Sequence, residues 1–341
     1  MQSRRAILVS REVHDHYGSA IVEAFSAPDG SCELLPVDAG ASFGDARLRD
    51  VCAGFVSVDV LGESSKDRLT PLMATFCDLL LRAPALSWVQ VSSAGVDRPQ
   101  YQALMRRGVT LTHAGGIAST TVAHSAIAGV LALARELPRW AALQRERRWA
   151  PARGADAPQD LDGQTALVVG LGAIGGEVAR LCRTLGMRVV GFSRSGSPVQ
   201  VCDEVHRIGA LDAHLPAADW LILCCPLTPA TRHLVGGRQL AGLPRGARIV
   251  DVSRGGVADG AALLAALQDG RLAGAYLDVF ETEPLPADSP FWSLPNVIVT
   301  PHAAGDSRGR ADRLVRFFLA NARRLARGES LRNVASPASV Q

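Results

Sequence analysis

Lysine is almost absent from this 341-residue chain, because Lys66 is the only one and arginine carries nearly all of the positive charge. The formal net charge of +3 is too small to indicate nucleic-acid binding. Long hydrophobic runs are also missing, since none approaches the roughly 18 residues that span a bilayer. The apolar run that follows Met1 is too short for a signal peptide, so the sequence predicts a cytoplasmic protein without a membrane partner.

The cysteines exclude a fully paired disulfide framework. There are seven of them, which is an odd number, and they are scattered and mostly lie inside apolar runs. That pattern is typical of reduced thiols in a protein core. Cys224 and Cys225 are adjacent and would point to opposite faces of a strand, which makes them a poor metal-binding pair. We therefore predict no metal site.

The order of the apolar segments predicts an α/β protein of about two domains. Short β-runs alternate with helical patterns over residues 1–112, and the alternation resumes at residue 165. A repeated βαβα pattern predicts doubly wound parallel sheets with helices on both faces. Between the two parts, a long apolar helix is expected over residues 125–149, capped near Ser119 and broken or kinked at Pro138.

A glycine-rich turn stands at the start of the second part. The apolar run 166–169 meets Gly170, Gly172 and Gly175, and a helical pattern and a second β-run follow. Within about 30 residues this is the context that a dinucleotide-binding G-x-G-x-x-G requires. The helix N-terminus would offer N–H groups and a positive dipole end to a pyrophosphate. The stretch therefore predicts nucleotide binding, with an ordinary glycine-rich βα turn as the alternative.

Three charged side chains, Arg254, Glu283 and His302, each follow a β-run of the same predicted sheet. Because the carboxyl ends of parallel strands share one edge, we expect these groups to converge. An arginine binds a carboxylate through a bidentate fork, a histidine transfers protons, and a neighbouring carboxylate raises the histidine pKa. Beside a nucleotide turn they predict hydride-transfer chemistry, whereas each alone is typical of a solvated or salt-bridged surface group.

Five motifs in this order resemble those of the D-isomer-specific 2-hydroxyacid dehydrogenases. They occupy residues 170–175, 226–231, 252–256, 277–286 and 300–305. The resemblance implies that Arg254 binds the substrate carboxylate and carbonyl, that His302 is the catalytic acid/base and that Glu283 is its partner. It also implies that backbone N–H groups of Ala94 and Gly95 bind the substrate carboxylate, with Arg254 and His302 completing the substrate site.

The same resemblance implies a domain division and a set of cofactor contacts. Residues 1–112 plus 307–341 would form a flavodoxin-like substrate-binding domain, with a Rossmann NAD(P)-binding domain, 113–306, inserted in it. Subunits would form a homodimer through the 119–149 helix region. The implied cofactor-binding residues are Gly170, Gly172, Ala173, Ile174, Gly175, Ser193, Arg194, Ser195, Cys225, Pro226, Thr231, Val252, Ser253, Asp278 and Gly305, of which Asp278 would lie near the nicotinamide carboxamide.

Three residues depart from the family pattern. His124 stands where the family usually has Glu, and His113 and Asp251 stand where it usually has Asn. None of them removes a catalytic group. We expect structural roles for His113 and His124, and strand alternation leaves the direction of Asp251 open.

The end of the second β-run bears on the choice between NAD and NADP. An NAD site typically has an acidic residue about 20 residues after the glycines, which bonds the ribose 2′-hydroxyl. Here Ser193, Arg194 and Ser195 occupy that position. No carboxylate repels a 2′-phosphate, and an arginine with two hydroxyls can bind one. The turn predicts NADP(H), with NAD(H) and a solvated turn arginine as the alternatives.

Together these features predict NADPH-dependent reduction of a small 2-keto acid, such as glyoxylate or hydroxypyruvate, to the D-2-hydroxy acid. Formate and phosphite oxidation are disfavoured, because the family's enzymes for them carry Gln at the position of Glu283 and Lys at that of Ala94. Phosphoglycerate oxidation is less expected, since its enzymes often add a C-terminal regulatory domain. Two alternatives stay open: an NAD-dependent D-2-hydroxyacid dehydrogenase with another substrate, and a nucleotide-sensing scaffold or corepressor on the same fold.

Overall fold

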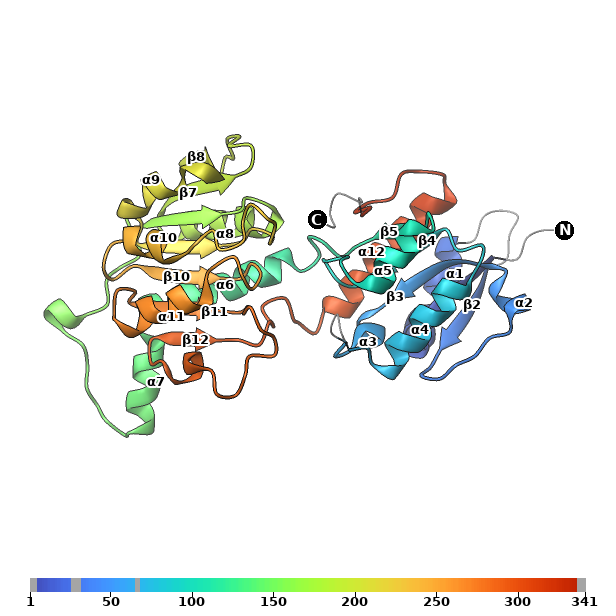
Figure 1. Cartoon of the computed structure of the whole chain (residues 1–341), viewed down its shortest axis with the longest axis horizontal. Helices are drawn as coiled ribbons and strands as arrows, with labels where there is room; N and C mark the ends of the chain where they lie inside the picture. The colour runs from blue at the N-terminus through green and yellow to red at the C-terminus, as the bar shows by residue number, and fades with distance from the viewer. Residues whose placement is uncertain (1–4, 26–31, 65–67, 336–341) are drawn as a thin grey trace. The chain divides into compact units, whose positions relative to one another are not determined.

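The computed structural model describes residues 5–25, 32–64 and 68–335 (Figure 1). The chain forms two compact units, Met1–Ile117 with Ser307–Gln341, and Ala118–Asp306. The predicted boundary after residue 112 is too early, because the next residues are bonded into the first unit. The N–H of His113 donates to the carbonyl of Asn333 at 3.0 Å, and the N–H of Ala114 donates to that of Ser93 at 2.9 Å.

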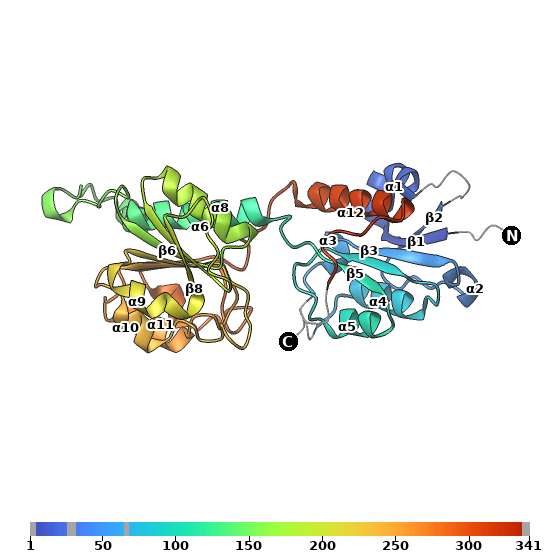
Figure 2. The same cartoon turned by 90° about the horizontal axis from the view of Figure 1, so that it is seen from above.

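The first unit is a three-layer α/β structure around a parallel sheet in the order β2-β1-β3-β4-β5, as in flavodoxin-like folds. Helices α1 and α12 cover one face of the sheet, and α4 and α5 cover the other (Figure 2). The elements are β1 (Arg5–Ser10), α1 (Arg11–Phe25), β2 (Cys32–Val37), α2 (Asp45–Leu48), β3 (Val51–Val56), α3 (Val58–Leu61), α4 (Pro71–Arg82), β4 (Trp88–Val91), α5 (Pro99–Arg106), β5 (Thr110–Thr112) and α12 (Arg310–Ala326).

Helix α12 joins the first unit because its apolar stripe is buried there. The ring of Phe318 stacks on Phe55 at 4.6 Å and on Trp88 at 5.1 Å between centroids, and Leu314 is buried beside them. Burying one such side chain contributes about 1.5–3 kcal/mol. This packing makes α12, which follows the second unit in the sequence, part of the first unit.

The second unit is a seven-stranded parallel sheet in the order β12-β11-β10-β9-β6-β7-β8. Helices α6 and α8 cover one face, and α9, α10 and α11 cover the other (Figure 2). The strands are β6 (Thr165–Val169), β7 (Arg188–Ser193), β8 (Glu204–Arg207), β9 (Trp220–Leu223), β10 (Arg248–Asp251), β11 (Gly274–Leu277) and β12 (Val297–Val299). The helices are α6 (Ser119–Ala134), α7 (Leu137–Arg145), α8 (Ala173–Thr184), α9 (Leu211–His214), α10 (Gly237–Gly242) and α11 (Gly260–Gln268), with 3₁₀ turns η1 (Gly154–Asp156), η2 (Ile208–Ala210), η3 (Leu215–Ala217) and η4 (Pro290–Ser293).

This strand order places a topological switch point between β6 and β9, where the chain reverses direction across the sheet. Open α/β sheets bind ligands at the carboxyl ends of the strands that flank such a point. The predicted fold class, two doubly wound parallel sheets with one inserted in the other, is confirmed. Within the described residues, no helix is both long and apolar enough to cross a membrane.

The helix predicted over 125–149 agrees with the structure at its break and differs from it at its start. The break expected at Pro138 is confirmed: α6 ends at Ala134, Glu136 adopts a left-handed φ of 52°, and α7 begins at Leu137 with Pro138 in its first turn. Helix α6 starts earlier, with Ala118 as its N-cap and Ser119 inside the helix. The pattern does not predict β8, since this edge strand is largely polar.

Candidate active site

The glycine-rich turn lies at the switch point, and its three glycines have different surroundings. Gly170 has a left-handed φ of 98°, and a Cβ on it would lie 2.6 Å from the backbone nitrogen of Cys225. A Cβ on Gly175 would collide with the carbonyl oxygen of Gly170. A Cβ on Gly172, the N-cap of α8, would meet no protein atom within 4 Å. Two glycines thus allow tight packing, and the third leaves open space before the N-terminus of a helix.

The loop after β9 forms the other side of the switch point. Thr231 holds this loop in place through two hydrogen bonds. Its hydroxyl donates to the carbonyl of Pro226 at 2.7 Å and accepts from the N–H of Thr228 at 2.7 Å. Cys225 is buried under Gly170. The predicted cofactor residues of the glycine turn and of this loop are therefore brought together.

The serine–arginine–serine turn follows the end of β7. The Ser193 hydroxyl accepts from the N–H of Gly196 at 3.0 Å, which closes the turn. Arg194 is exposed and forms no ion pair with any described residue. Opposite Ser193 on β8 lies Arg207, which sequence reasoning did not single out because β8 was not predicted. No carboxylate occupies the three positions of this turn.

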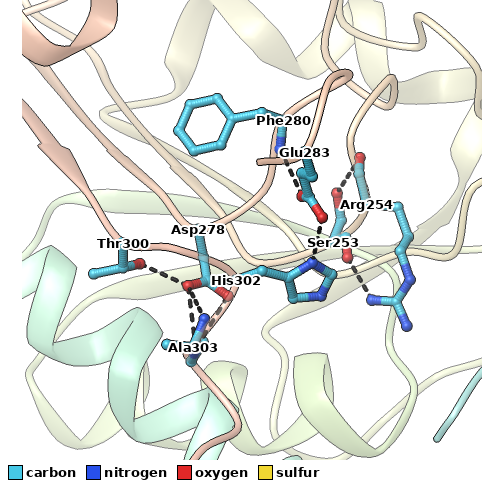
Figure 3. Close-up of polar contacts among 9 residues, drawn as sticks. Ser253, Arg254, Asp278, Phe280, Glu283, Thr300, His302 and Ala303 are labelled. Atoms are coloured by element: carbon cyan, nitrogen blue, oxygen red, sulfur yellow. Dashed lines mark hydrogen bonds and ion pairs between the residues drawn. The ribbon is translucent and has the colours of Figure 1, made fainter. Parts of the chain in front are cut away.

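The adjacent strands β10, β11 and β12 carry the three predicted catalytic groups beyond their carboxyl ends. All three belong to the second unit. The Nδ1 of His302 lies 2.8 Å from the Oε2 of Glu283, and the N–H of Phe280 donates to Oε1 of the same carboxylate at 3.0 Å. Figure 3 shows the imidazole of His302 held by Glu283 on one side, with Arg254 beside it. Strands far apart in the sequence thus supply one cluster.

The Glu283 carboxylate and the His302 imidazole shift each other's pKa. The hydrogen bond from Glu283 raises the pKa of His302, against the opposing effect of burial. Burial would raise the pKa of Glu283, but hydrogen bonds from His302 and the Phe280 N–H bring it below its ordinary value. Because Nδ1 is engaged by Glu283, the Nε2 of His302 is the nitrogen left to exchange a proton with a ligand.

The Arg254 side chain is held by a hydrogen bond to the backbone of its own turn. Its guanidinium donates to the carbonyl of Ser253 at 2.7 Å and forms no ion pair with any residue in the described ranges. The next residue, Gly255, packs against the Phe280 carbonyl so closely that a Cβ would overlap it. The exposed guanidinium keeps most of its donors available for an anionic ligand.

Asp278 supports the segment that carries His302. Its buried carboxylate accepts from the Thr300 hydroxyl at 2.6 Å and from the N–H groups of Ala303 at 2.9 Å and Ala304 at 3.1 Å (Figure 3). Its carbonyl accepts from the N–H of His302 at 2.9 Å, where the backbone has a left-handed φ of 53°. These bonds hold His302 in a conformation that non-glycine residues seldom adopt.

Asp251 is buried one strand away, and its side chain points inward. Its Oδ1 accepts from the N–H of Ser253 at 2.9 Å and from the Ser253 hydroxyl at 2.5 Å. Burial raises the pKa of Asp251 to about 7, which the bonds from Ser253 only partly offset. The sequence left the direction of this side chain open, and the structure shows that it points into the protein. There its bonds to Ser253 hold the segment that leads to Arg254.

An Asp251→Asn variant should be more stable than the parent, by an amount that grows as pH rises from 5 to 7. The unfolded chain loses this proton near pH 4, whereas the folded chain keeps it up to about pH 7, so ionisation favours unfolding in that interval. Asparagine accepts the Ser253 bonds without ionising. We expect the Tm difference to widen by roughly 5 °C in calorimetry. The exposed Asp269→Asn variant is the control, and a pH-independent difference at Asp251 would contradict the assignment.

The remaining predicted residues lie at several places. Val252 and Ser253 are buried after β10, and a Cβ on Gly305 would touch Ala118 and Val122 of the second unit at 3.4 Å. Ala94 and Gly95 belong to the first unit, exposed in the loop after β4.

The two histidines that depart from the family pattern lie outside the catalytic cluster. The Nδ1 of His113 accepts from the N–H of Gly115 at 3.0 Å, and burial lowers the pKa of His113. His124 is exposed on α6. The His113 contact is the local structural one that we expect of that residue.

A sequence profile described as the D-isomer specific 2-hydroxyacid dehydrogenase, NAD binding domain, matches residues 127–304. The chain belongs to this family. Its membership confirms the predicted resemblance and assigns the chain to the NAD(P)-dependent oxidoreductases, with a nicotinamide cofactor. The open space at Gly172, next to the N-terminus of α8, fits the pyrophosphate of such a cofactor.

Three relatives of this 2-hydroxyacid dehydrogenase are informative. A glyoxylate reductase of Korarchaeum cryptofilum is 35% identical over 256 residues, which cover 72% of this chain and 75% of that protein. A D-3-phosphoglycerate dehydrogenase of Methanocaldococcus jannaschii is 33% identical over 77% of this chain, which spans only 50% of that protein. The structure of an NADPH-dependent glyoxylate/hydroxypyruvate reductase from Sinorhizobium meliloti, in complex with NADP and sulfate, has 28% identity and a TM-score of 0.74 over 99% of this chain and 100% of that one.

Proposed function

We propose that this protein reduces a small 2-keto acid, with glyoxylate or hydroxypyruvate as the first candidates, to the D-2-hydroxy acid with NADPH. The observation that carries the proposal is the 2.8 Å bond between Nδ1 of His302 and Glu283, with Arg254 beside the pair. The reduced nicotinamide supplies the hydride when bound. His302, whose pKa is raised by Glu283, donates a proton from Nε2 to the carbonyl oxygen, and Arg254 binds the substrate carboxylate.

We further propose roles for the two units. The second unit would hold the dinucleotide at the predicted glycines, at the loop that contains Pro226 and Thr231, and at the turn after β7. In the first unit, the N–H groups of Ala94 and Gly95 would bind the substrate carboxylate. The names of the glyoxylate reductase relatives favour a small keto acid, and the exposed Arg254 guanidinium is chemically suited to its carboxylate.

We propose a homodimer formed through the 119–149 region. Helix α7 has no buried residue. Leu137, its first residue, is 52% exposed, and Trp149, which follows the helix, is 97% exposed. Such apolar exposure is typical of a surface that another subunit covers. Sedimentation equilibrium of the full chain tests this proposal.

NADPH is the proposed cofactor because Arg194 forms no ion pair with the residues that the structure describes, and its turn, Ser193–Ser195, contains no carboxylate. An Arg194→Ala variant should raise the KM for NADPH by roughly 10- to 100-fold, since a hydrogen bond to a charged group contributes about 1.5–3 kcal/mol. The KM for NADH should change little. The exposed Arg245→Ala variant is a matched control, and an unchanged KM for NADPH in Arg194→Ala would rule out this role.

A panel of 2-keto acids with NADPH and with NADH tests the function itself. Glyoxylate, hydroxypyruvate, larger 2-keto acids and the keto acid of 3-phosphoglycerate should be compared by kcat/KM, and the product analysed for the D configuration. Steady NADPH consumption with a small keto acid supports the proposed reaction. Tight cofactor binding without turnover on any of them would favour the scaffold or corepressor alternative.

A further inference from the structure

Two histidines and a glutamate that have no part in the proposed reaction meet at the outer edge of the second sheet. Glu204 and His206 lie two residues apart on β8, so their side chains project from the same face. His214 ends the short helix α9, which follows β8 in the chain. One ligand atom from each of the three lies within 4.8 Å of the other two.

The three side chains are already ordered by contacts with one another. The Nε2 of His206 lies 3.0 Å from Oε2 of Glu204, and the imidazole rings of His206 and His214 are 4.2 Å apart between centroids. The ring of Phe192 packs against both imidazoles, at 6.0 Å and 5.5 Å. About a third of the His206 side chain is exposed, so the cluster is reachable from solvent.

We propose that Glu204, His206 and His214 form a binding site for Zn²⁺. Two imidazole nitrogens and one carboxylate oxygen are a ligand set that zinc takes in proteins, with a further position open to water. Mg²⁺ and Ca²⁺ instead prefer sites built from oxygen alone. Ligand atoms within 4.8 Å need only side-chain movement to come within about 2.0–2.2 Å of one ion.

The neighbouring charges are compatible with a cation. Arg188 pairs with the Oε1 oxygen of Glu204, which leaves Oε2 facing His206. The other acid of α9, Asp212, is engaged by Arg238 at 2.7 Å and by the side-chain amide of Gln239 at 3.1 Å. The proposed ligand set therefore uses the Oε2 oxygen of Glu204, while Oε1 stays paired with Arg188, and it does not draw on Asp212.

Zinc titration of the metal-free, untagged full chain tests the site. Chelator-treated protein should bind one equivalent of Zn²⁺ in competition with a chromogenic chelator, and its Tm should rise because the ion binds the folded state. His206→Gln and His214→Gln should each weaken binding at least about tenfold. His233→Gln is the matched control, since its imidazole lies 3.3 Å from Glu281 and belongs to no three-ligand group among the residues that the structure describes.

The site is rejected if the chain binds no stoichiometric Zn²⁺, or if both glutamine variants bind it as tightly as the parent. The latter result would assign the ion to surface histidines elsewhere, such as His14 and His16. Tm values in excess chelator verify that each variant is folded. Visible absorption of the Co²⁺-loaded parent is an independent measurement, and loss of its bands in a Glu204→Gln variant is also expected. The proposal does not depend on the dehydrogenase reaction, because no readout uses turnover.

Discussion

Replacing His302 by glutamine is expected to lower kcat for keto-acid reduction by roughly 10²- to 10⁴-fold, the usual contribution of a positioned general acid. Glutamine retains a hydrogen-bonding side chain but cannot deliver a proton. The dissociation constant of NADPH should change little. The glycine turn follows β6 and the Ser193–Arg194–Ser195 turn follows β7, whereas His302 follows β12 at the far edge of the sheet. Single-turnover kinetics and cofactor fluorescence measure the two quantities. Full activity in the variant would refute the proton role.

A Glu283→Gln variant separates proton donation from position. The Glu283 carboxylate raises the pKa of His302, and only the protonated imidazole donates in reduction. The rate of reduction should therefore fall as pH rises through this pKa, and in the variant the fall should begin at lower pH. A pH profile of kcat/KM reports the shift. A lower rate with an unmoved profile would mean that Glu283 only positions the ring.

Removal of the Arg254 guanidinium should also greatly lower the activity on a keto acid. We expect Arg254→Ala to lower kcat/KM for the keto acid by roughly 10²- to 10³-fold, since truncating one partner of a desolvated charge pair costs about 2–5 kcal/mol. Arg254→Lys should recover part of the loss, because it keeps the charge but lacks the planar fork that matches a carboxylate. Steady-state kinetics with saturating NADPH measure both variants.

The Arg254 substitutions should not disturb the fold. In the part of the chain that the structure describes, the guanidinium bonds to the Ser253 carbonyl of its own turn and forms no ion pair. The change should thus leave Tm near that of the parent. As a further check, a neutral aldehyde substrate should lose far less activity than the keto acid in Arg254→Ala. Equal losses with both would show that the guanidinium does not recognise the carboxylate.

Local patterns in the sequence were sufficient to predict the glycine turn, the parallel sheets and the three catalytic candidates. The reason is that G-x-G-x-x-G and strand-end charges lie within short segments, and the carboxyl ends of parallel strands share an edge by geometry. The same locality explains the failures. Strand β8 was not predicted because an edge strand needs no apolar alternation, whereas Pro138 alone was enough to predict the break between α6 and α7.

By itself, the sequence determined which chemical groups are available: a guanidinium, an imidazole, a carboxylate, and a turn without an acid at the end of β7. Only the tertiary structure decided which of them meet. It paired His302 with Glu283, turned Asp251 inward where burial raises its pKa, and brought Glu204, His206 and His214 together at one edge. Such contacts depend on strand order, loop path and side-chain direction. Those are set by packing over the whole unit, even where the residues that meet are close in the sequence.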